Sequence, residues 1–509
     1  MRGGRAVGAI VVIGAGPAGT CVVDRICAHA PRPGNGHAVE IHVVDSGAPG
    51  PERASDAAPA GGRAVHDAPR GVRVHVHHDR AVGLSESAGR QLVRLLGGGT
   101  LGADAVVLAQ SRPGVPLGPA EREEALFAAR HGLLHLPSGS DQKHLENVPA
   151  GEPVLVRGAG RAFIDLLAPL TVGRGGRFTR GRRGEPVYLP GGFEPFLYAG
   201  SRRGVPHHAR PGYRLAGEAR TRRFPCEGDA RQATAKELAY AYYQELFTAH
   251  PSRTRTTWAA FEPAFARAEP GGKEMRALVT KSVPRFADRL HLDRLERPLH
   301  GMRFGDLPGL QRWMHGYLAA DLERRADPAF SPDLALVRAL QDARSRMAGD
   351  PWFDGLSGLL ADGPSLDRQA ELHALARAGI VTFIGAEPRV EQDDGGWRAS
   401  SPTVPGVTRA RTLMEARPRP APAGSADPLI AGLFARGECR EAAGLLDVRP
   451  ADGRLITGDG SVHGRRFALG SLVAGGTAND GPATLLCRAD AVARAVLSQV
   501  SRAPAHAAA

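Results

Sequence analysis

Three glycines at the start of the chain have the spacing with which a backbone turn can hold phosphate groups. Gly14, Gly16 and Gly19 follow the apolar run 9–13 in the stretch VVIGAGPAGT. In such a turn the first glycine permits a sharp bend, the second lets the backbone approach a pyrophosphate, and the third lets the next helix pack against the strand. The N–H groups and positive dipole of that helix start attract phosphates. The residues predicted to bind a dinucleotide here are Gly14, Gly16, Pro17, Ala18 and Gly19.

An acidic residue closes the following predicted strand. Residues 39–45, VEIHVVD, alternate and then turn apolar, which indicates a strand with Asp45 at its carboxyl end. A carboxylate there can accept hydrogen bonds from the adenosine ribose of a dinucleotide. Asp45 follows Gly19 by 26 residues, more than the usual spacing of about 20, because the loop 31–36 adds length. A strand, turn and helix that keep their glycines for packing and bind no ligand are the alternative.

A second glycine turn lies in GEPVLVRGAGRAFIDLL, residues 151–167. Gly158 and Gly160 follow the short apolar strand 154–156, and Phe163 stands where a third glycine is usual. We predict that Gly158 and Gly160 bind NAD(P); a purely structural turn is the alternative. Guanidinium groups downstream could read the 2′-phosphate of NADPH or form a solvated basic loop. They belong to Arg174, Arg177, Arg180, Arg182 and Arg183.

A loop rich in glycine, proline and basic residues follows, at 188–213. Such a composition disfavours a helix and is typical of loops that carry binding residues. We predict that Arg202, Arg203 and His207 contact a cofactor or the substrate, and structural hydrogen bonding within the loop is the alternative.

Several segments together resemble a known family. They are GAGPAG, EPVLVRGAGRAFIDLLAPLTVGRGGRF, EPFLYAGSRRGVPHHAR, HLDRLERPLHGMRF, GYLAADLERRADP and RRFALGSLVAGGT. They are similar to the bacterial FAD/NAD(P)-binding proteins common in actinomycetes, which are distantly similar to class B flavin monooxygenases and amine N-hydroxylases. The resemblance covers most of the chain. It implies an FAD-dependent oxidoreductase that is reduced by NAD(P)H and can act as a monooxygenase on a small molecule.

The resemblance also implies a contact near the carboxyl terminus. The block RRFALGS looks like the last strand of the flavin domain, and many flavoproteins place an aspartate after it, on the ribityl chain. Ser471 stands at that position and can form hydrogen bonds without a charge. Gly470 and Ser471 are therefore expected to contact FAD.

Three departures from the family pattern favour a different function. Gln110 and Ser111 follow the strand 103–109, where a glycine is usual, and Phe163 replaces the third glycine of the second turn. Only about 25 loop-like residues follow Asp45, whereas family members carry a long segment that lies over the flavin. The alternative function is therefore a non-catalytic or accessory Rossmann-fold protein with a degenerate flavin site.

The pattern of elements predicts an α/β protein with two Rossmann-like dinucleotide-binding domains and a helical insertion. We expect the first part of a discontinuous FAD domain at 1–149 and an NAD(P)-binding segment at 150–213. Helical periodicity predicts an insertion or lid at 214–377. The strands 378–385 and 412–416 are interpreted as the return to the FAD domain, which would then occupy 378–509.

Composition excludes several classes of protein. The net charge of +12 favours anionic ligands, but no nucleic-acid-binding motif accompanies it. Five cysteines without a CxxC pattern argue against zinc and disulfides, and the histidines of HVHH, 75–78, are expected on an exposed edge strand and not at a metal. No apolar stretch approaches the roughly 20 residues that span a bilayer. We therefore expect a cytoplasmic protein without a metal, nucleic-acid or membrane partner; the sequence does not set its oligomeric state.

Overall fold

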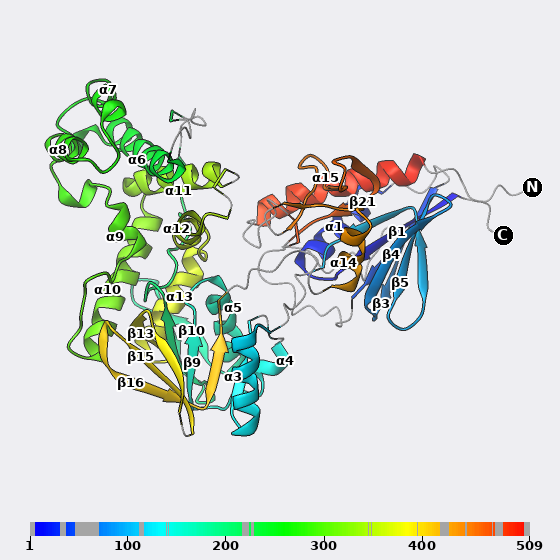
Figure 1. Ribbon diagram of the computed structural model, residues 1–509, viewed down its shortest axis with the longest axis horizontal. Coiled ribbons are helices and arrows are strands. Elements are labelled where there is room, and N and C mark those ends of the chain that lie inside the picture. Colours follow the sequence, from blue (N-terminus) through cyan, green and yellow to red (C-terminus); the bar gives the residue numbers. More distant parts are fainter. Residues whose placement is uncertain are drawn as a thin grey trace, which may run out of the picture. The chain divides into compact units, whose positions relative to one another are not determined.

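The chain folds into two compact units, seen in the computed structural model in Figure 1. Unit 1 comprises Met1–Pro116 and Arg419–Ala509, and unit 2 comprises Leu117–Pro418. The structure describes residues 6–30, 37–45, 71–110, 117–138, 140, 142–215, 223–224, 229–344, 346–347, 349–393, 395–417, 427–442, 445–470, 472–473 and 482–502.

Unit 1 is built on a six-stranded sheet of order β20-β21-β7-β1-β2-β3. Strand β1 pairs in parallel with both β2 and β7, so it lies near the middle of the sheet. This position explains the continuous apolar run at the amino terminus, because a central parallel strand is covered on both faces. The strands are β1 (Ala6–Ile13), β2 (His37–Val44), β3 (Val72–His77), β7 (Ala105–Leu108), β20 (Arg454–Ile456) and β21 (Val462–Ala468).

Alternate residues of β1 enter two separate cores. Ile10 and Val12 pack with helices α1 (Pro17–His29) and α15 (Pro482–Arg502). Val11 and Ile13 pack on the opposite face. That face is covered by a small antiparallel sheet and by helix α14. The two-stranded sheet β18–β19 follows α14 in the chain. The elements are β4 (Ala81–Ser87), β5 (Arg90–Leu95), β6 (Thr100–Ala103), α14 (Pro428–Ala435), β18 (Glu441–Ala442) and β19 (Leu445–Leu446).

Unit 2 contains a five-stranded parallel sheet of order β13-β12-β9-β17-β8. Helix α5 (Arg161–Leu170) connects β9 to the hairpin β10–β11, which precedes β12, and an antiparallel meander of three strands leads from β13 to β17. The strands of the unit are β8 (Leu134–Leu136), β9 (Pro153–Arg157), β10 (Arg177–Arg180), β11 (Pro186–Leu189), β12 (Phe196–Ser201), β13 (Val381–Ala386), β14 (Arg389–Asp393), β15 (Gly396–Ser401), β16 (Val404–Ala410) and β17 (Thr412–Glu415). Helices α3 (Pro119–Arg130) and α4 (Gln142–Leu145) precede β9.

A helical insertion joins β12 to β13, as the sequence predicted for the region 214–377. Its aromatic side chains form a core: Phe261, Phe265 and Phe353 are fully buried, which confirms their interpretation as packing residues. The helices are α6 (Ala230–Ala249), α7 (Trp258–Arg267), α8 (Lys273–Ser282), α9 (Leu292–Glu296), α10 (Leu307–Ala326), α11 (Ser331–Ala343), α12 (Pro351–Ala361) and α13 (Leu366–Arg377). No helix in the described ranges has the length and apolar character that a membrane crossing requires.

The predicted point of return to the first domain needs correction. Strands β13 and β17 were assigned to the FAD domain, but β13 pairs with β12 and β17 pairs with β9. Likewise β8, expected in the first domain, pairs with β17. The apolar pattern locates a buried strand but does not identify the strand that it pairs with. Unit 2 therefore begins at residue 117 and extends to 418.

Candidate functional site

The first glycine turn connects β1 to α1 in unit 1 and needs glycine at two positions. Gly14 has φ +108°, and a Cβ atom there would come within 2.6 Å of the Gln110 backbone. A Cβ atom on Gly19 would lie 1.9 Å from the carbonyl oxygen of Gly14. Both positions therefore require the absence of a side chain, and α1 packs directly onto the turn.

The amino terminus of α1 presents backbone donors beside this turn. Gly16 is the N-cap residue and Pro17 is the first helical residue, so no side chain caps the helix start. The N–H groups of a helix's first turn have no partner within the helix, and they attract anions together with the helix dipole. The arrangement suits a pyrophosphate.

Two other predicted residues lie at the same turn. The Oδ2 atom of Asp45, just after β2, accepts a hydrogen bond from the Ala15 N–H at 2.6 Å. Gly470, just after β21, has φ +92°, and a Cβ atom there would lie 2.9 Å from the Cβ of Ala18. The structure thus brings the predicted residues of unit 1 together, although Ser471 lies outside the described residues. The Cβ-free cradle, the open helix start and the acid together fit the pyrophosphate and ribose of FAD.

Gln110 follows β7, one residue before Ser111, which stands where the family pattern has glycine and lies outside the described residues. Its backbone contacts the Cβ position of Gly14, and its side-chain Nε2 donates to Asp427 Oδ2 at 2.9 Å. Asp427 also caps helix α14 by accepting from the N–H groups of Leu429 and Ile430. Gln110 therefore links the first glycine turn to α14.

The second glycine turn connects β9 to α5 in unit 2. Gly158 has φ +122°, and a Cβ atom there would come within 2.7 Å of the Ala416 backbone. Gly160 is the N-cap residue of α5, again without a side-chain cap. Phe163, at the third glycine position, is fully buried in the hydrophobic core. The phenylalanine therefore serves packing, and the first two positions keep the features of a phosphate-binding turn.

The imidazole of His207 lies against this second turn. A Cβ atom on Gly160 would come within 2.9 Å of its Cε1 atom, and the His207 N–H donates to the Ala159 carbonyl oxygen at 3.3 Å. Burial, followed by the charges of Arg203 and His208, lowers the pKa of His207 to about 4. The imidazole is therefore neutral at neutral pH, and its Nδ1 atom is buried without a hydrogen-bond partner among the described residues.

The neighbouring residue, His208, anchors the loop to the helical insertion. Its Nδ1 atom is 2.6 Å from Asp321 Oδ1, and its Nε2 atom is 3.0 Å from the Tyr317 hydroxyl, both on α10. Asp321 also accepts from the Ala209 N–H at 2.8 Å and pairs with Arg325 at 3.3 Å. Burial raises the pKa of Asp321, but the charges of His208 and Arg325 and the hydrogen bonds from His208 and the Ala209 N–H together outweigh that effect and lower it.

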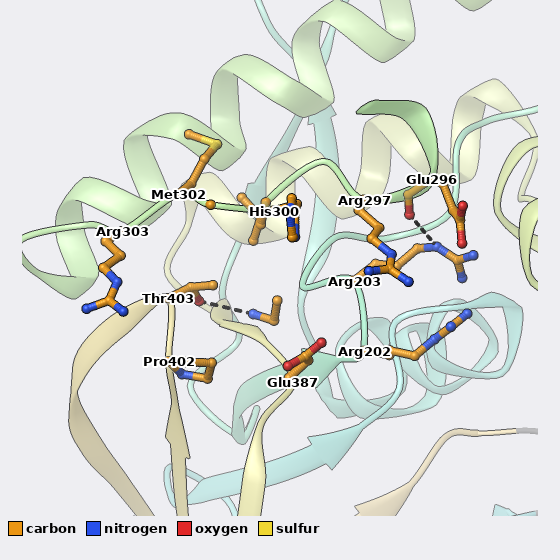
Figure 2. Close-up of a pocket in the computed structure, with 13 residues that line it drawn as sticks. Arg202, Arg203, Glu296, Arg297, His300, Met302, Arg303, Glu387, Pro402 and Thr403 are labelled. Atoms are coloured by element: carbon orange, nitrogen blue, oxygen red, sulfur yellow. Dashed lines mark hydrogen bonds between the residues drawn. The ribbon is translucent and has the colours of Figure 1, made fainter. Parts of the chain in front are cut away.

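A cavity of about 270 Å³ lies beside the other two predicted residues of this loop (Figure 2). Arg202 and Arg203 line it directly after β12. Glu296, at the end of α9, and residues 297 and 299–303, between α9 and α10, line it from the insertion. Its lining combines charged and apolar residues. We call this cavity the arginine pocket, and its charged or basic residues are Arg202, Arg203, Arg297, His300, Arg303 and the acids Glu296 and Glu387.

Sequence reasoning missed the insertion's contribution to the arginine pocket. These residues fall within HLDRLERPLHGMRF, a segment that contributes to the family resemblance but contains no predicted binding residue. The arginines between 174 and 183 do not line the pocket. The guanidinium of Arg174 instead donates to the carbonyl oxygens of Leu145 and Val148, at 2.7 and 3.0 Å, which is a structural role.

Of the three histidines at 75–78, His75 and His78 are exposed, as predicted, and His77 is half-buried. Strand β3 is the edge strand of the main sheet, as predicted, but His77 Nε2 lies 2.9 Å from His42 Nδ1 on β2. The rings of His42 and His75 also stack, with centroids 5.0 Å apart. Within the described ranges, no group of three or more His, Cys, Asp or Glu residues has the geometry to hold a metal ion.

Comparisons with known proteins agree with a two-nucleotide flavoprotein. A family model described as FAD-NAD(P)-binding matches residues 11–61 and 58–113. The chain is 33% identical to a nitrosuccinic acid synthase of Aspergillus oryzae, over 85% of this chain and 74% of the relative. It is 31% identical to an L-aspartate N-monooxygenase (nitrosuccinate-forming) of Streptomyces davaonensis, over 96% of this chain and 97% of the relative. A solved structure, oxidized steroid monooxygenase bound to NADP, matches 98% of this chain and 87% of its own, with 13% identity and a TM-score of 0.43.

The relatives contain segments that this chain lacks. The alignment with the Streptomyces davaonensis protein is 636 residues long, which exceeds the 509 residues of this chain. The match to the family model is also divided, at residues 58–61. That division falls in the stretch after Asp45 where the sequence predicts a shortened segment, and it lies outside the described residues.

Proposed function

The chain belongs to the FAD/NAD(P)-binding family that includes the L-aspartate N-monooxygenases, and we propose that it has the same activity. It would then oxygenate the amino nitrogen of L-aspartate and form nitrosuccinate. The chain is an FAD-dependent oxidoreductase that uses NAD(P)H, and it is a monooxygenase acting on a small molecule. Nitrosuccinate or its acid is the product named for both relatives, and L-aspartate is the substrate named for the Streptomyces davaonensis protein.

One structural observation supports this function above the others. Each unit contains a glycine turn at the carboxyl end of a parallel strand, followed by a helix without a side-chain cap. We assign FAD to the turn of unit 1, with Gly14, Gly16, Gly19 and Asp45 as contacts. We assign NAD(P)H to the turn of unit 2, with Gly158, Gly160 and His207 as contacts.

The chemistry divides between the cofactor and the chain. Bound FAD supplies hydride acceptance from NAD(P)H and, once reduced, reaction with oxygen. The chain's own residues bind and orient. The helix starts after Gly16 and Gly160 attract the phosphate groups, and Asp45 lies where the adenosine ribose is bound in such folds. The neutral imidazole of His207 covers the second turn without adding charge.

The net charge of the chain is consistent with an anionic substrate, and its buried cysteines are consistent with a reducing compartment. L-Aspartate carries two carboxylates, and the net charge of +12 favours its approach. Cys21, Cys27 and Cys439 are buried and unpaired, which suits a reducing compartment. We therefore propose that the protein acts in the cytoplasm.

Product analysis tests the proposed function. The protein is supplied with FAD and incubated with NADPH, oxygen and L-aspartate, and the products are identified by mass spectrometry. We expect nitrosuccinate, with faster NADPH oxidation in the presence of L-aspartate than with D-aspartate, L-glutamate or L-asparagine. A flavin-loaded, NADPH-reducible protein that gives no N-oxygenated product from any of the four would contradict the proposal.

An accessory role is the second candidate. The observation that favours it is the length of the alignment, because the relatives contain segments that this chain lacks. This candidate requires a folded protein that fails to retain FAD, and the flavin content of the purified protein separates the two.

A further inference from the structure

Gln110 and Asp427 form a hydrogen-bonded pair at the point where the strand order of unit 1 reverses. The chain passes from β1 to β2 and β3 on one side of β1, and it then returns to β7 on the other side. In an open sheet of this kind, ligands bind outside the carboxyl ends of the strands at the reversal. Gly14 follows β1 and Gln110 follows β7, so both residues lie where such a sheet binds its ligand.

The pair joins the segment that leaves unit 1 to the segment that returns to it. Gln110 is the last described residue before the chain passes into unit 2, and Asp427 is the first described residue after its return. The Nε2 atom of Gln110 donates to Oδ2 of Asp427 at 2.9 Å. The other carboxylate oxygen accepts from the N–H groups of Leu429 and Ile430 at the start of α14, at 2.9 and 3.2 Å. The carboxylate is buried, with the Nη2 atom of Arg80 3.9 Å from Oδ2, so its oxygens depend on these hydrogen bonds.

The backbone at Ala109 and Gln110 forms one wall of the first glycine turn. The Ala109 N–H donates to the Ile13 carbonyl oxygen at 2.8 Å, which extends the pairing of β7 with β1 up to the turn. A Cβ atom on Gly14 would lie 2.6 Å from the N and Cα atoms of Gln110. The position of Gln110 therefore fixes the space available to Gly14. A shift of the Gln110 backbone would move the turn and, with it, the N–H groups that face a pyrophosphate.

Unit 2 repeats this arrangement with different side chains. Its strand order reverses between β9 and β17, and a Cβ atom on Gly158 would come within 2.7 Å of the Ala416 backbone, just after β17. The guanidinium of Arg157 donates to both carboxylate oxygens of Glu124 on α3, at 2.7 and 2.6 Å, and its Nε atom lies 3.1 Å from Oε2 of Glu415. Helix α3 begins just after the chain enters unit 2, and β17 ends just before it leaves. In both units, therefore, polar side chains join the entering and leaving segments at a glycine turn, which favours a role at the turn itself.

We propose that Gln110 and Asp427 are positioning residues for FAD. The hydrogen bond between their side chains holds the backbone after β7 against Gly14, and this contact keeps the first turn in the shape that binds the pyrophosphate. Neither side chain is assigned a contact with FAD; both act through the backbone of the turn. The inference rests on the binding of FAD to unit 1, which the proposed function assigns.

The test changes the charges of the pair with little change in its size. In Gln110→Glu two carboxylates face each other, whereas in Asp427→Asn an amide nitrogen replaces one carboxylate oxygen and the asparagine can still cap α14. The double variant Gln110→Glu/Asp427→Asn restores a hydrogen bond with donor and acceptor exchanged. Gln499→Glu, the same substitution at a half-buried position of α15, is the matched control. Gln110→Met removes the donor without adding a charge and carries the test if Gln110→Glu does not fold.

The dissociation constant of FAD is measured from the quenching of flavin fluorescence by the apoprotein. It is measured at about pH 8, where both carboxylates of Gln110→Glu are ionised, and at about pH 5.5, where two adjacent carboxylates share a proton. Chemical denaturation of each apoprotein gives its folded fraction, and the dissociation constant is referred to folded protein. A purely structural role would lower the free energy of unfolding and leave the FAD affinity of the folded protein unchanged.

We expect Gln110→Glu to raise the dissociation constant of FAD about tenfold or more over wild type at the higher pH, because a buried hydrogen bond is replaced by repulsion. At the lower pH this ratio falls, because the shared proton lets the two carboxyl groups form a hydrogen bond. Gln110→Met raises the constant about tenfold at both pH values. The double variant, Asp427→Asn and Gln499→Glu bind FAD within about threefold of wild type. The affinity for NADP⁺, measured by calorimetry, stays unchanged in every variant because both residues of the pair belong to unit 1.

Wild-type FAD affinity in folded Gln110→Glu or Gln110→Met at both pH values would overturn the inference. So would an affinity that stays low in the double variant, because the effect would then not arise from the pair. A folded wild-type protein that binds no FAD would contradict the proposed function and the inference with it. Flavin that binds but is not reduced by NADPH would count against the proposed function alone.

Discussion

The imidazole of His207 lies directly against Gly160, at the start of helix α5. A Cβ atom added to Gly160 would come within 2.9 Å of its Cε1 atom and 3.0 Å of its Nε2 atom. This contact joins two residues that the sequence separately predicted to bind a cofactor. The loop that carries Arg202 and Arg203 is thereby held at the second glycine turn.

Replacing Gly160 by alanine tests the second turn. The added methyl group displaces His207, and we expect the dissociation constant of NADPH to rise at least tenfold, with FAD content unchanged because Gly160 belongs to unit 2. Gly316→Ala is the matched control, since nothing lies within 4 Å of a Cβ atom there. Unchanged NADPH binding in a folded Gly160→Ala protein would show that the nucleotide does not use this turn.

Replacing Gly14 by alanine tests the first turn. The backbone conformation at φ +108° and the 2.6 Å approach to Gln110 both exclude a side chain. We expect loss of FAD retention and a fall in the free energy of unfolding, measured by flavin absorbance and by chemical denaturation. Gly464→Ala, on an open stretch of β21, is expected to retain FAD. Full flavin content in a Gly14→Ala protein would refute the assignment.

Replacing Asp321 by asparagine tests the anchor of the loop. The buried carboxylate accepts hydrogen bonds from His208 and the Ala209 N–H and pairs with Arg325. Removing one partner of such a buried network costs about 3–5 kcal/mol, and we expect the free energy of unfolding to fall by that order. Asp342→Asn, at an exposed position, should change it by less than about 0.5 kcal/mol. If Asp321→Asn lowered the free energy of unfolding by less than about 0.5 kcal/mol, the structural role of the network would be contradicted.

The stability of the protein should fall in mild acid. Burial is the main cause that lowers the pKa of His207 and of His373 to about 4, from 6.5. Between these values the unfolded chain binds more protons than the folded one, so stability decreases as the pH falls from about 6.5 to about 4. His207, which is almost fully buried, contributes up to about 3 kcal/mol, and the half-buried His373 contributes less because solvent screens its charge. We expect His373→Gln to reduce this pH dependence in denaturation curves; an identical slope in the variant would show that His373 is not the source.

The local features of the fold were predictable from the sequence, because their signals lie within a few residues. The apolar run before Gly14, the second turn at Gly158 and the helical insertion all lie where the sequence predicted them. The pairing of β13 with β12 was not predictable, because the long helical insertion separates the two strands and the apolar pattern does not identify the strand with which β13 pairs.

The candidate site was predictable in part for the same reason. Arg202, Arg203 and His207 stood out because they lie in a stretch, 188–213, that is rich in glycine, proline and basic residues. The strand β12 within that stretch was not predicted. Arg297 and His300 reach the same cavity only through the folding of the insertion, and their helical neighbourhood contains no motif for phosphate binding. The hydrogen bond that fixes Arg203, from its Nε atom to the carbonyl oxygen of Glu296, is a contact that only the three-dimensional structure supplies.

The central claim is that unit 1 binds FAD and that NADPH bound to unit 2 reduces it. The most direct measurement is the visible absorption spectrum of the purified protein supplied with FAD, recorded before and after NADPH is added without oxygen. We predict a bound-flavin spectrum that bleaches on addition of NADPH and returns when oxygen is admitted. A well-folded protein that retains no flavin would contradict the claim and would support the accessory role instead.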